Sequence, residues 1–225
     1  MYATAADQDL EQIRTLFLQM CVRAESMVRR SVRSVVERDA ELGRSVIDTD
    51  REIDALEVEI DRACLRCLAL RQPVGRDLRL VTAVLKVVTD LERIGDLAVN
   101  IARRGLELSA GSGVQPHLDL VRMGEVAADM VRVAADAFVQ DDPELASTLR
   151  ARDEEVDQLN RQAFARWLEA MAAHPSQAER ALALTSISRH VERIADHAVN
   201  VGEMVVFLVE GRDVRHAAKV TEPAV

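Results

Sequence analysis

Apolar residues recur every three or four positions along most of the 225-residue chain, which is the spacing of amphipathic helices. The first such stretch covers about residues 9–37 and has apolar side chains at Leu10, Ile13, Leu16, Phe17, Met20, Ala24, Met27, Val28, Val32 and Val35. No segment shows the sustained two-residue alternation of a half-buried strand, so strands are not expected. The pattern therefore predicts an all-α protein.

Capping residues and prolines divide this pattern into six long helices. Asp39 is a predicted N-cap, and the second helix follows it to about Leu70. Pro73 is predicted in the first turn of a third helix, which continues to about Leu108. Residues 109–116, rich in glycine and serine, then form a predicted linker.

Three more helices follow the linker. Their expected extents, in chain order, are from Leu120 past Phe138, from the cap pair Asp142-Pro143 to about Ala172, and from His174-Pro175 to a C-terminal cap at Gly211. Long antiparallel helices joined by short turns form bundles. The helix order therefore predicts two groups of three helices each.

The two halves of the chain carry copies of the same sequence. Residues 92–100 read ERIGDLAVN and residues 192–200 read ERIADHAVN, so seven of the nine positions are identical at an offset of 100. The second helices of the halves match at an offset of 103, with 39–42 paired with 142–145 and 50–54 with 153–157. Apolar periodicity alone would rarely reproduce Glu, Arg, Asp and Asn together, so the pattern indicates an internal duplication.

These observations predict two tandem, pseudo-symmetric three-helix bundles. The first is expected to cover residues 1–111 and the second residues 112–211, with residues 212–225 as a flexible tail. Gly95 in the first copy and Ala195 in the second are expected to permit close approach of helices.

Composition and charge narrow the functional classes. The formal net charge of −9 disfavours nucleic-acid binding, which depends on an excess of lysine and arginine. The cluster Arg29, Arg30 and Arg33 is interpreted as a solvated helix face. No signal peptide and no membrane-spanning run is expected, and three cysteines suit a reducing cytoplasm. Cys64 and Cys67 are interpreted as core residues instead of metal ligands.

Acidic residues line one face of two predicted helices in each half, because residues four apart share a helix face. The first half places Asp50, Asp54, Glu57 and Asp61 on its second helix, and Glu92, Asp96 and Asn100 on its third. The second half places Asp153, Asp157 and Asn160 opposite Glu192, Asp196 and Asn200. Two carboxylates ~6 Å apart repel by about 3 kcal/mol at an effective dielectric constant near 20, so the arrangement requires compensation.

Three kinds of compensation remain open from the residues alone. Neighbouring arginines such as Arg93 and Arg193 could pair with the acids, or water and salt could screen an exposed face. Alternatively, the paired helices could hold a cation, since carboxylate oxygens are hard ligands. Asn100 and Asn200 either make an interhelical hydrogen bond or complete the acidic site.

Enzyme interpretations lack support in the sequence. A carboxylate-bridged di-iron bundle needs Glu-x-x-His motifs on two helices, and no Glu in this chain has a His three residues later. His190 and His197 flank the second motif but are expected on other sides of the helix from Glu192. No catalytic triad order, glycine-rich phosphate loop or zinc spacing is present either.

The segment Asp-Leu-Glu-Arg-Ile-Gly-Asp-Leu-Ala-Val-Asn-Ile-Ala at 90–102 resembles the third-helix motif of the PhoU family, accessory proteins of phosphate signalling. The tripeptide Asp-Leu-Arg at 77–79 and the pair Asp50 and Asp54 are similar to that family, as is the weaker repeat at 190–200. The resemblance extends over residues 10–211. It implies two three-helix bundles in tandem.

The resemblance also implies a function and a set of partners. Members of the family are associated with the high-affinity phosphate ABC transporter and with a sensor histidine kinase, and, with no catalytic constellation in the sequence, the chain is expected to be cytoplasmic and not an enzyme. A member would act as an adaptor to the transporter's ATPase subunit and to that kinase, restraining phosphate uptake and the starvation response when phosphate is plentiful. A homodimer is a further expectation, without nucleic-acid binding or membrane insertion. The alternative is a metal-binding or metal-storing helical protein, or a carboxylate-bridged metalloenzyme.

Some family members bind multinuclear clusters of iron or zinc through Glu/Asp-x-x-x-Asp motifs, with magnesium and manganese as alternatives here. By position, the implied ligands are Asp50, Asp54, Glu92, Asp96, Asp153, Asp157, Glu192 and Asp196, with Glu57, Asn100 and Asn200 as additional candidates. The second copy departs from the first because His190 replaces Asp90 and Asn160 replaces Glu57. Its site is therefore less acidic, and its occupancy is less expected than that of the first.

Overall fold

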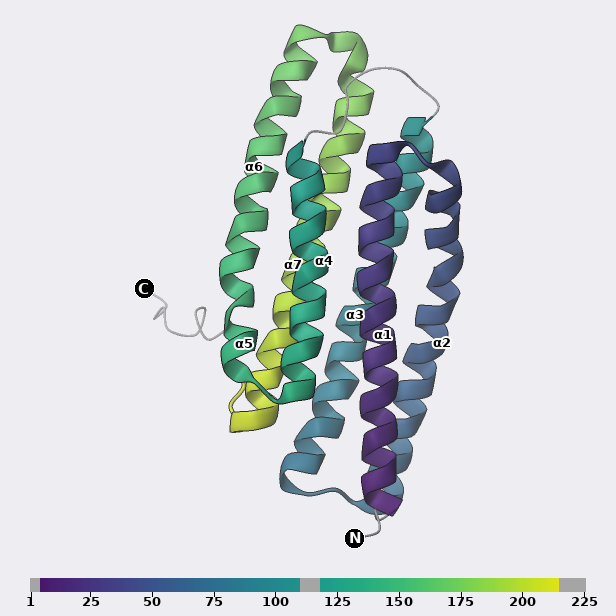
Figure 1. Ribbon diagram of the computed structural model, residues 1–225, viewed down its shortest axis with the longest axis vertical. Coiled ribbons are helices and arrows are strands. Elements are labelled where there is room, and N and C mark those ends of the chain that lie inside the picture. Colours follow the sequence, from purple (N-terminus) through teal and green to yellow (C-terminus); the bar gives the residue numbers. More distant parts are fainter. Residues whose placement is uncertain (1–4, 110–117, 215–225) are drawn as a thin grey trace, which may run out of the picture.

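The computed structural model describes residues 5–109 and 118–214, and every regular element in those two ranges is helical. In chain order the elements are α1 (Ala5–Glu37), α2 (Ala40–Arg71), α3 (Gly75–Ser109), α4 (Leu118–Gln140), α5 (Pro143–Ser147), α6 (Leu149–Ala173), the 3₁₀ turn η1 (Pro175–Gln177) and α7 (Ala178–Glu210). Figure 1 shows the long helices running side by side in alternating directions. The all-α prediction is confirmed.

Three predicted caps are confirmed. The Asp39 carboxylate accepts a hydrogen bond from the Leu42 N–H at 2.9 Å, and Asp142 accepts from the N–H groups of Glu144 and Leu145. These bonds satisfy backbone donors that a helix start leaves without intrahelical partners. Gly211 adopts the left-handed conformation (φ 72°) that ends α7.

Three boundaries differ from the sequence prediction. Pro73 lies in the connection before α3, not in its first turn. The positive φ of both Gln72 and Gly75 reverses the chain there, so the helix begins only at Gly75. The predicted fifth helix is divided at Thr148, whose N–H bonds the Leu145 carbonyl in a tight turn. The predicted sixth helix, expected to start at His174-Pro175, begins with the 3₁₀ turn η1, and its α-helical part, α7, starts at Ala178.

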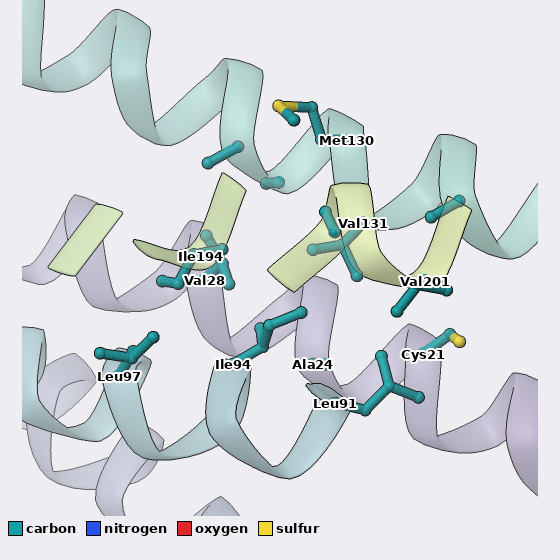
Figure 2. Close-up of a cluster of buried hydrophobic side chains, with 14 of the residues drawn as sticks. Cys21, Ala24, Val28, Leu91, Ile94, Leu97, Met130, Val131, Ile194 and Val201 are labelled. Carbon is teal, nitrogen blue, oxygen red and sulfur yellow. The ribbon is translucent and has the colours of Figure 1, made fainter. Parts of the chain in front are cut away.

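The two repeats share one continuous hydrophobic core. α1 and α3 of the first repeat pack against α4 and α7 of the second, with α3 and α7 in the most extensive contact. Figure 2 shows the centre of this contact, where Val28 of α1 and Ile94 of α3 meet Val131 of α4 and Ile194 of α7. All four side chains are buried, so the bundles form a single six-helix body.

Two arginines tie the ends of α3 and α7 in reciprocal fashion. The Arg79 guanidinium near the start of α3 donates to the Leu208 carbonyl near the end of α7, at 3.0 Å. The Arg180 guanidinium near the start of α7 donates to the Leu108 carbonyl near the end of α3, at 2.7 Å. Last-turn carbonyls lack intrahelical partners, so each arginine caps the other repeat's helix.

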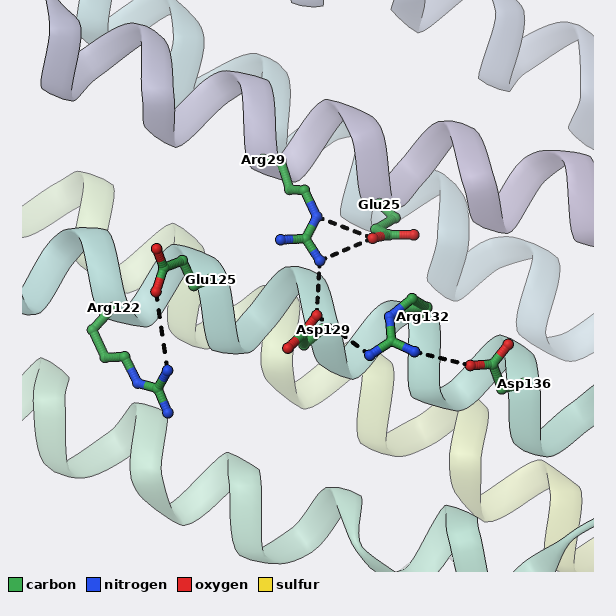
Figure 3. A network of polar contacts seen from close by, with 7 residues as sticks. All are labelled: Glu25, Arg29, Arg122, Glu125, Asp129, Arg132 and Asp136. Atoms are coloured by element: carbon green, nitrogen blue, oxygen red, sulfur yellow. Dashed lines mark hydrogen bonds and ion pairs between the residues drawn. The ribbon is translucent and has the colours of Figure 1, made fainter.

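A polar network joins α1 to α4 on the surface (Figure 3). Arg29 of α1 donates to Glu25 on its own helix and to Asp129 of α4, at 3.0 and 2.8 Å. The rest of the basic cluster is also engaged, because Arg30 donates to Ser45 and Arg33 to Glu37. The three arginines therefore connect neighbouring side chains, as an ordinary amphipathic surface does.

The cysteines belong to the core, as predicted for Cys64 and Cys67. Both side chains are fully buried, and burial raises the pKa of the Cys64 thiol to about 12. A thiol in that state is a poor metal ligand and nucleophile. Within the two described ranges, none of the helices is long and apolar enough to cross a membrane. The predicted domain boundary at 111/112 and most of the predicted linker and tail lie outside the described residues.

Candidate functional site: two carboxylate faces

The first carboxylate face lies between α2 and α3. The pKa of Asp50 is raised, chiefly by burial and then by the charges of Asp54 on its own helix and Asp96 across the interface. Burial also raises the pKa of Glu92, with Asp96 and Glu57 adding to it. The α2 and α3 acids predicted from sequence are therefore brought together.

An arginine offsets part of this repulsion. The Arg93 guanidinium lies 3.4 Å from a Glu92 carboxylate oxygen and 3.1 Å from one of Asp96. It also lowers the pKa of Glu57, which burial and the charges of neighbouring acids otherwise raise. Ion pairing, one of the three kinds of compensation expected from the sequence, thus operates on this face.

The second face lies between α6 and α7 and is more strongly perturbed. Burial and the charges of Asp196, Asp157 and Glu192 raise the pKa of Asp153 from its ordinary 3.8 to about 6. Burial followed by like charges also raises the pKa of Glu192 and of Asp196. Arg161 lies 3.8 Å from Asp157 at the solvent side. This face has fewer acids than the first, yet burial raises the pKa of Asp153 enough to bring it to about 6.

The carboxylates fit a cation in chemistry and in charge. Hard oxygen donors from two helices face each other, and burial, followed by the charges of neighbouring carboxylates, raises the pKa values of Asp50 and Asp153. Within residues 5–109 and 118–214, however, no three His, Cys, Asp or Glu side chains lie close enough together to hold a metal ion. Side chains would have to change rotamer before three carboxylates reached one ion.

A polar contact between the repeats was not predicted. Asp90 of α3 accepts a hydrogen bond from the Asn200 amide of α7 at 3.0 Å, and His197 Nδ1 lies 2.8 Å from the same carboxylate oxygen. Asn200 therefore makes an interhelical hydrogen bond, one of the two roles considered for it. The sequence signal for this contact is a difference between the two copies. Leu97 stands at the position equivalent to His197, and His190 stands at the position equivalent to Asp90.

Neutralising Asp153 is expected to stabilise the protein at pH 7.5. The native state binds the Asp153 proton more tightly than the unfolded chain does, so this group's contribution to the free energy of unfolding falls as pH rises from about 4 to about 6 and stays low above. Asp153→Asn should therefore raise the free energy of unfolding by about 1 kcal/mol at pH 7.5, after discounting for partial exposure. At pH 4 it should give no gain.

Thermal or urea unfolding at the two pH values measures this difference. Glu169→Gln, at an exposed position of the same helix, is the matched control and should have no pH-dependent effect. An equal effect of Asp153→Asn at pH 4 and pH 7.5 would contradict the electrostatic explanation.

The fold and the faces define a class of protein: a duplicated six-helix body with paired acidic surfaces. A model of the PhoU domain matches this chain twice, at residues 17–105 and 120–205. The chain therefore belongs to the PhoU family.

Similar proteins agree over nearly the whole length. The "Phosphate-specific transport system accessory protein PhoU homolog" of Pseudomonas putida is 38% identical, over 92% of this chain and 82% of its own. The homologue of the same name from Aquifex aeolicus is 35% identical, over 93% and 95%. The crystal structure of PhoU from Pseudomonas aeruginosa superposes with a TM-score of 0.88 at 35% identity, over 92% of this chain and 99% of that one. "Phosphate transport system regulatory protein PhoU" from Streptococcus pneumoniae gives a TM-score of 0.86 at 26% identity, over 93% and 99%.

Proposed function

We propose that this protein is a non-enzymatic accessory regulator of a phosphate transport system. The observation that carries the proposal is the match of both repeats to the PhoU domain, together with relatives that carry this description and align over nine-tenths of the chain. The two carboxylate faces support an interaction role, since charged surfaces steer and select partners.

We propose further that the chain is a cytoplasmic adaptor. Its partners would be the ATPase subunit of the phosphate ABC transporter and a phosphate-sensing histidine kinase, and it would lower the activity of both when phosphate is plentiful. The single six-helix body suits this role because it presents two similar but unequal faces, one from each repeat. A homodimer remains a prediction.

Deleting the gene is expected to release phosphate control. In phosphate-replete medium the deletion strain should take up phosphate several-fold faster than the parent and should express its phosphate-starvation genes. Uptake of radiolabelled phosphate and a transcriptional reporter measure the two effects. Re-expression of the wild-type chain is the control, and unchanged uptake and transcription in the deletion strain would contradict the proposal.

A second candidate function is cation binding at the carboxylate faces. It is supported by the pairing of carboxylates across each face: after burial, the charges of neighbouring acids raise the pKa of Asp50, Glu92 and Asp153, and a bound cation would relieve that part of the effect. Such a cation, iron or zinc by family resemblance, or magnesium or manganese, would neutralise the facing acids and fix α2 against α3 or α6 against α7. The residues that would hold it are the acids of each face.

Elemental analysis of protein purified without a metal-affinity column tests this candidate. We expect at least one metal ion per chain, reduced in Asp54→Ala and Asp96→Ala. Less than one per chain, unchanged in those variants, would exclude metal binding at the first face.

A further inference from the structure

A groove runs between α1 and α2, which lie side by side at one edge of the body (Figure 1). Its volume is about 790 Å³, and its apolar lining comes from Leu18, Val22, Ala55 and Leu56. Val22 is 64% exposed, so this lining is open to solvent. Sites for small molecules have volumes of roughly 300–1,000 Å³ and combine an apolar lining with a few polar groups. The α1–α2 groove therefore has the size and character of such a site.

Arg30 of α1 brings a positive charge into this groove. Its guanidinium donates to the Ser45 hydroxyl at 2.6 Å and to the Thr49 hydroxyl at 3.4 Å. Both hydroxyls donate their own hydrogens to backbone carbonyls of α2, so they act on Arg30 as neutral acceptors. No carboxylate within residues 5–109 and 118–214 forms an ion pair with Arg30. A guanidinium has five N–H donors, so Arg30 retains donors that an anionic group in the groove can use.

The other arginine of the groove is already paired with an acid. The Arg23 guanidinium of α1 lies 3.0 Å from a Glu52 carboxylate oxygen of α2. Among the described residues that line the groove, Glu52 is the only acid. Because the charges of Arg23 and Glu52 cancel, Arg30 gives the groove a net positive charge, although the whole chain has a formal net charge of −9.

The second repeat shows that core packing does not require arginines on this side of the helix. At an offset of 103, the buried positions of α1 from residue 17 onward coincide with buried positions of α4. The positions equivalent to Arg23 and Arg30 are occupied in α4 by Val126 and Val133, which are only 5% and 4% exposed. The second repeat thus buries valines where the first repeat places two arginines beside an open groove.

We propose that the α1–α2 groove binds a free anionic amphiphile, a small molecule that carries a carboxylate or phosphate group on an apolar chain or ring. The anionic group accepts hydrogen bonds from Arg30, and the apolar body covers Val22 and Leu56. Guanidinium groups form strong and geometrically specific hydrogen bonds with carboxylates and phosphates. Val22 lies eight residues before Arg30, or about 12 Å along the helix, a distance that the chain of decanoate can span. The inference does not depend on the proposed regulatory function, because none of the acids of the two carboxylate faces lines this groove.

Decanoate is the probe, titrated below its micelle concentration into the full chain. Decyltrimethylammonium has the same chain with a cationic head and is titrated in parallel. NMR shifts of the Val22 and Leu56 methyl groups report occupancy of the groove. We expect saturable shifts with decanoate and binding at least tenfold weaker for the cationic molecule, because only an anionic head can accept hydrogen bonds from Arg30.

Arg30→Gln removes the positive charge and should raise the Kd of decanoate about tenfold or more. Arg33→Gln is the matched control. Arg33 is on the same helix and donates to Glu37, but it does not line the groove, so its loss should leave the Kd unchanged. Circular dichroism melting confirms that both variants are folded.

Val22→Glu tests the apolar part of the groove and does not depend on Arg30→Gln being folded. The second repeat carries Glu125 at the equivalent exposed position, so the fold should tolerate the change. The new carboxylate should repel decanoate and raise its Kd about tenfold or more. Val58→Glu, at a valine of α2 that is 46% exposed and outside the groove, should have no effect.

Several outcomes would overturn the proposal. They are the absence of saturable shifts with decanoate, equal binding of decyltrimethylammonium, an unchanged Kd in Val22→Glu, and an equal loss in Arg33→Gln. A wild-type dimer in sedimentation that Val22→Glu makes monomeric would identify the occupant as a second copy of the chain. Co-sedimentation with anionic phospholipid vesicles that Arg30→Gln abolishes, without binding of free decanoate, would assign the groove to a bilayer surface instead of a free ligand.

Discussion

Gly124→Val is expected to lower the free energy of unfolding by roughly 2–3 kcal/mol, or about 5–10 °C in melting temperature. Gly124 of α4 lies against Val32 of α1, where the two repeats meet. A Cβ atom at Gly124 would come within 2.7–2.9 Å of three side-chain atoms of Val32. Val32 is β-branched and cannot swing aside, so the helices must separate or the core must rearrange.

Two variants separate overpacking from helix propensity. Gly95→Ala places a methyl group 3.4 Å from Ile53, which is ordinary contact, and the second repeat already has Ala195 there. It should be neutral or stabilising by up to ~1 kcal/mol, because alanine favours helices over glycine. Combining Gly124→Val with Val32→Ala should recover part of the loss in a double-mutant cycle. Urea denaturation measures Gly95→Ala and the four proteins of the cycle, and a fully additive cycle would show that Gly124→Val and Val32 do not compete for the same space.

The same pair of residues shows what the sequence could predict of the fold. Val32 was recognised as a core position of the first helix from its spacing, and that prediction is confirmed. Its partner was not predictable, because periodicity identifies a buried face but not the helix that covers it. Gly124 breaks no pattern in α4, and only the contact between repeats gives it a role.

Helix ends are predictable from the sequence where a single capping side chain determines them. The caps Asp39 and Asp142 are predictable because a cap depends on one side chain and the backbone beside it. The predicted position of Pro73 in the first helical turn is wrong because positive φ angles at Gln72 and Gly75 set the turn, and a glutamine does not signal a positive φ in the sequence. The division of the fifth helix at Thr148 likewise has no signal in composition.

The sequence predicts the candidate site as two acidic helix faces, but it does not predict how deeply each carboxylate is buried. The four-residue spacing of Asp50 and Asp54 places both carboxylates on one side of a helix, whatever the tertiary structure. The degree of burial depends on how the neighbouring helix is packed, and this is what raises the pKa of Asp153 to about 6. Comparison of the copies predicts a less acidic second face, whereas the largest pKa shift among the acids of the two faces occurs there, at Asp153, because of its burial.

His197→Leu is expected to lower the free energy of unfolding by about 1–3 kcal/mol. The variant places at position 197 the leucine that the first repeat carries at 97, but it leaves the Asp90 carboxylate without its 2.8 Å contact. Only a fifth of each side chain, Asp90 and His197, is exposed to solvent, so water compensates incompletely. Asp90→Ala should cost a similar amount, because it leaves His197 and Asn200 without their acceptor.

A double-mutant cycle of Asp90→Ala and His197→Ala tests whether the contact joins the repeats. The double variant should be less destabilised than the two single losses predict, since removing both partners leaves no unpaired group. His197→Leu should also raise the pKa of Asp196, because the His197 charge lowers it in the native protein. Carbon-detected NMR titration of the Asp196 carboxyl measures this shift, and an unchanged value would restrict His197 to a packing role.

The position of this contact links stability to the candidate function. Asp90 lies half a turn before Glu92 of the first face, and His197 follows Asp196 of the second. The contacts from α7 to Asp90 therefore lie beside both carboxylate faces and add to the core packing that joins α3 to α7. If an adaptor must engage two partners at once, His197→Leu should impair phosphate control in cells more than Gly124→Val does at equal loss of stability, because it removes a contact between the helices that carry the two faces.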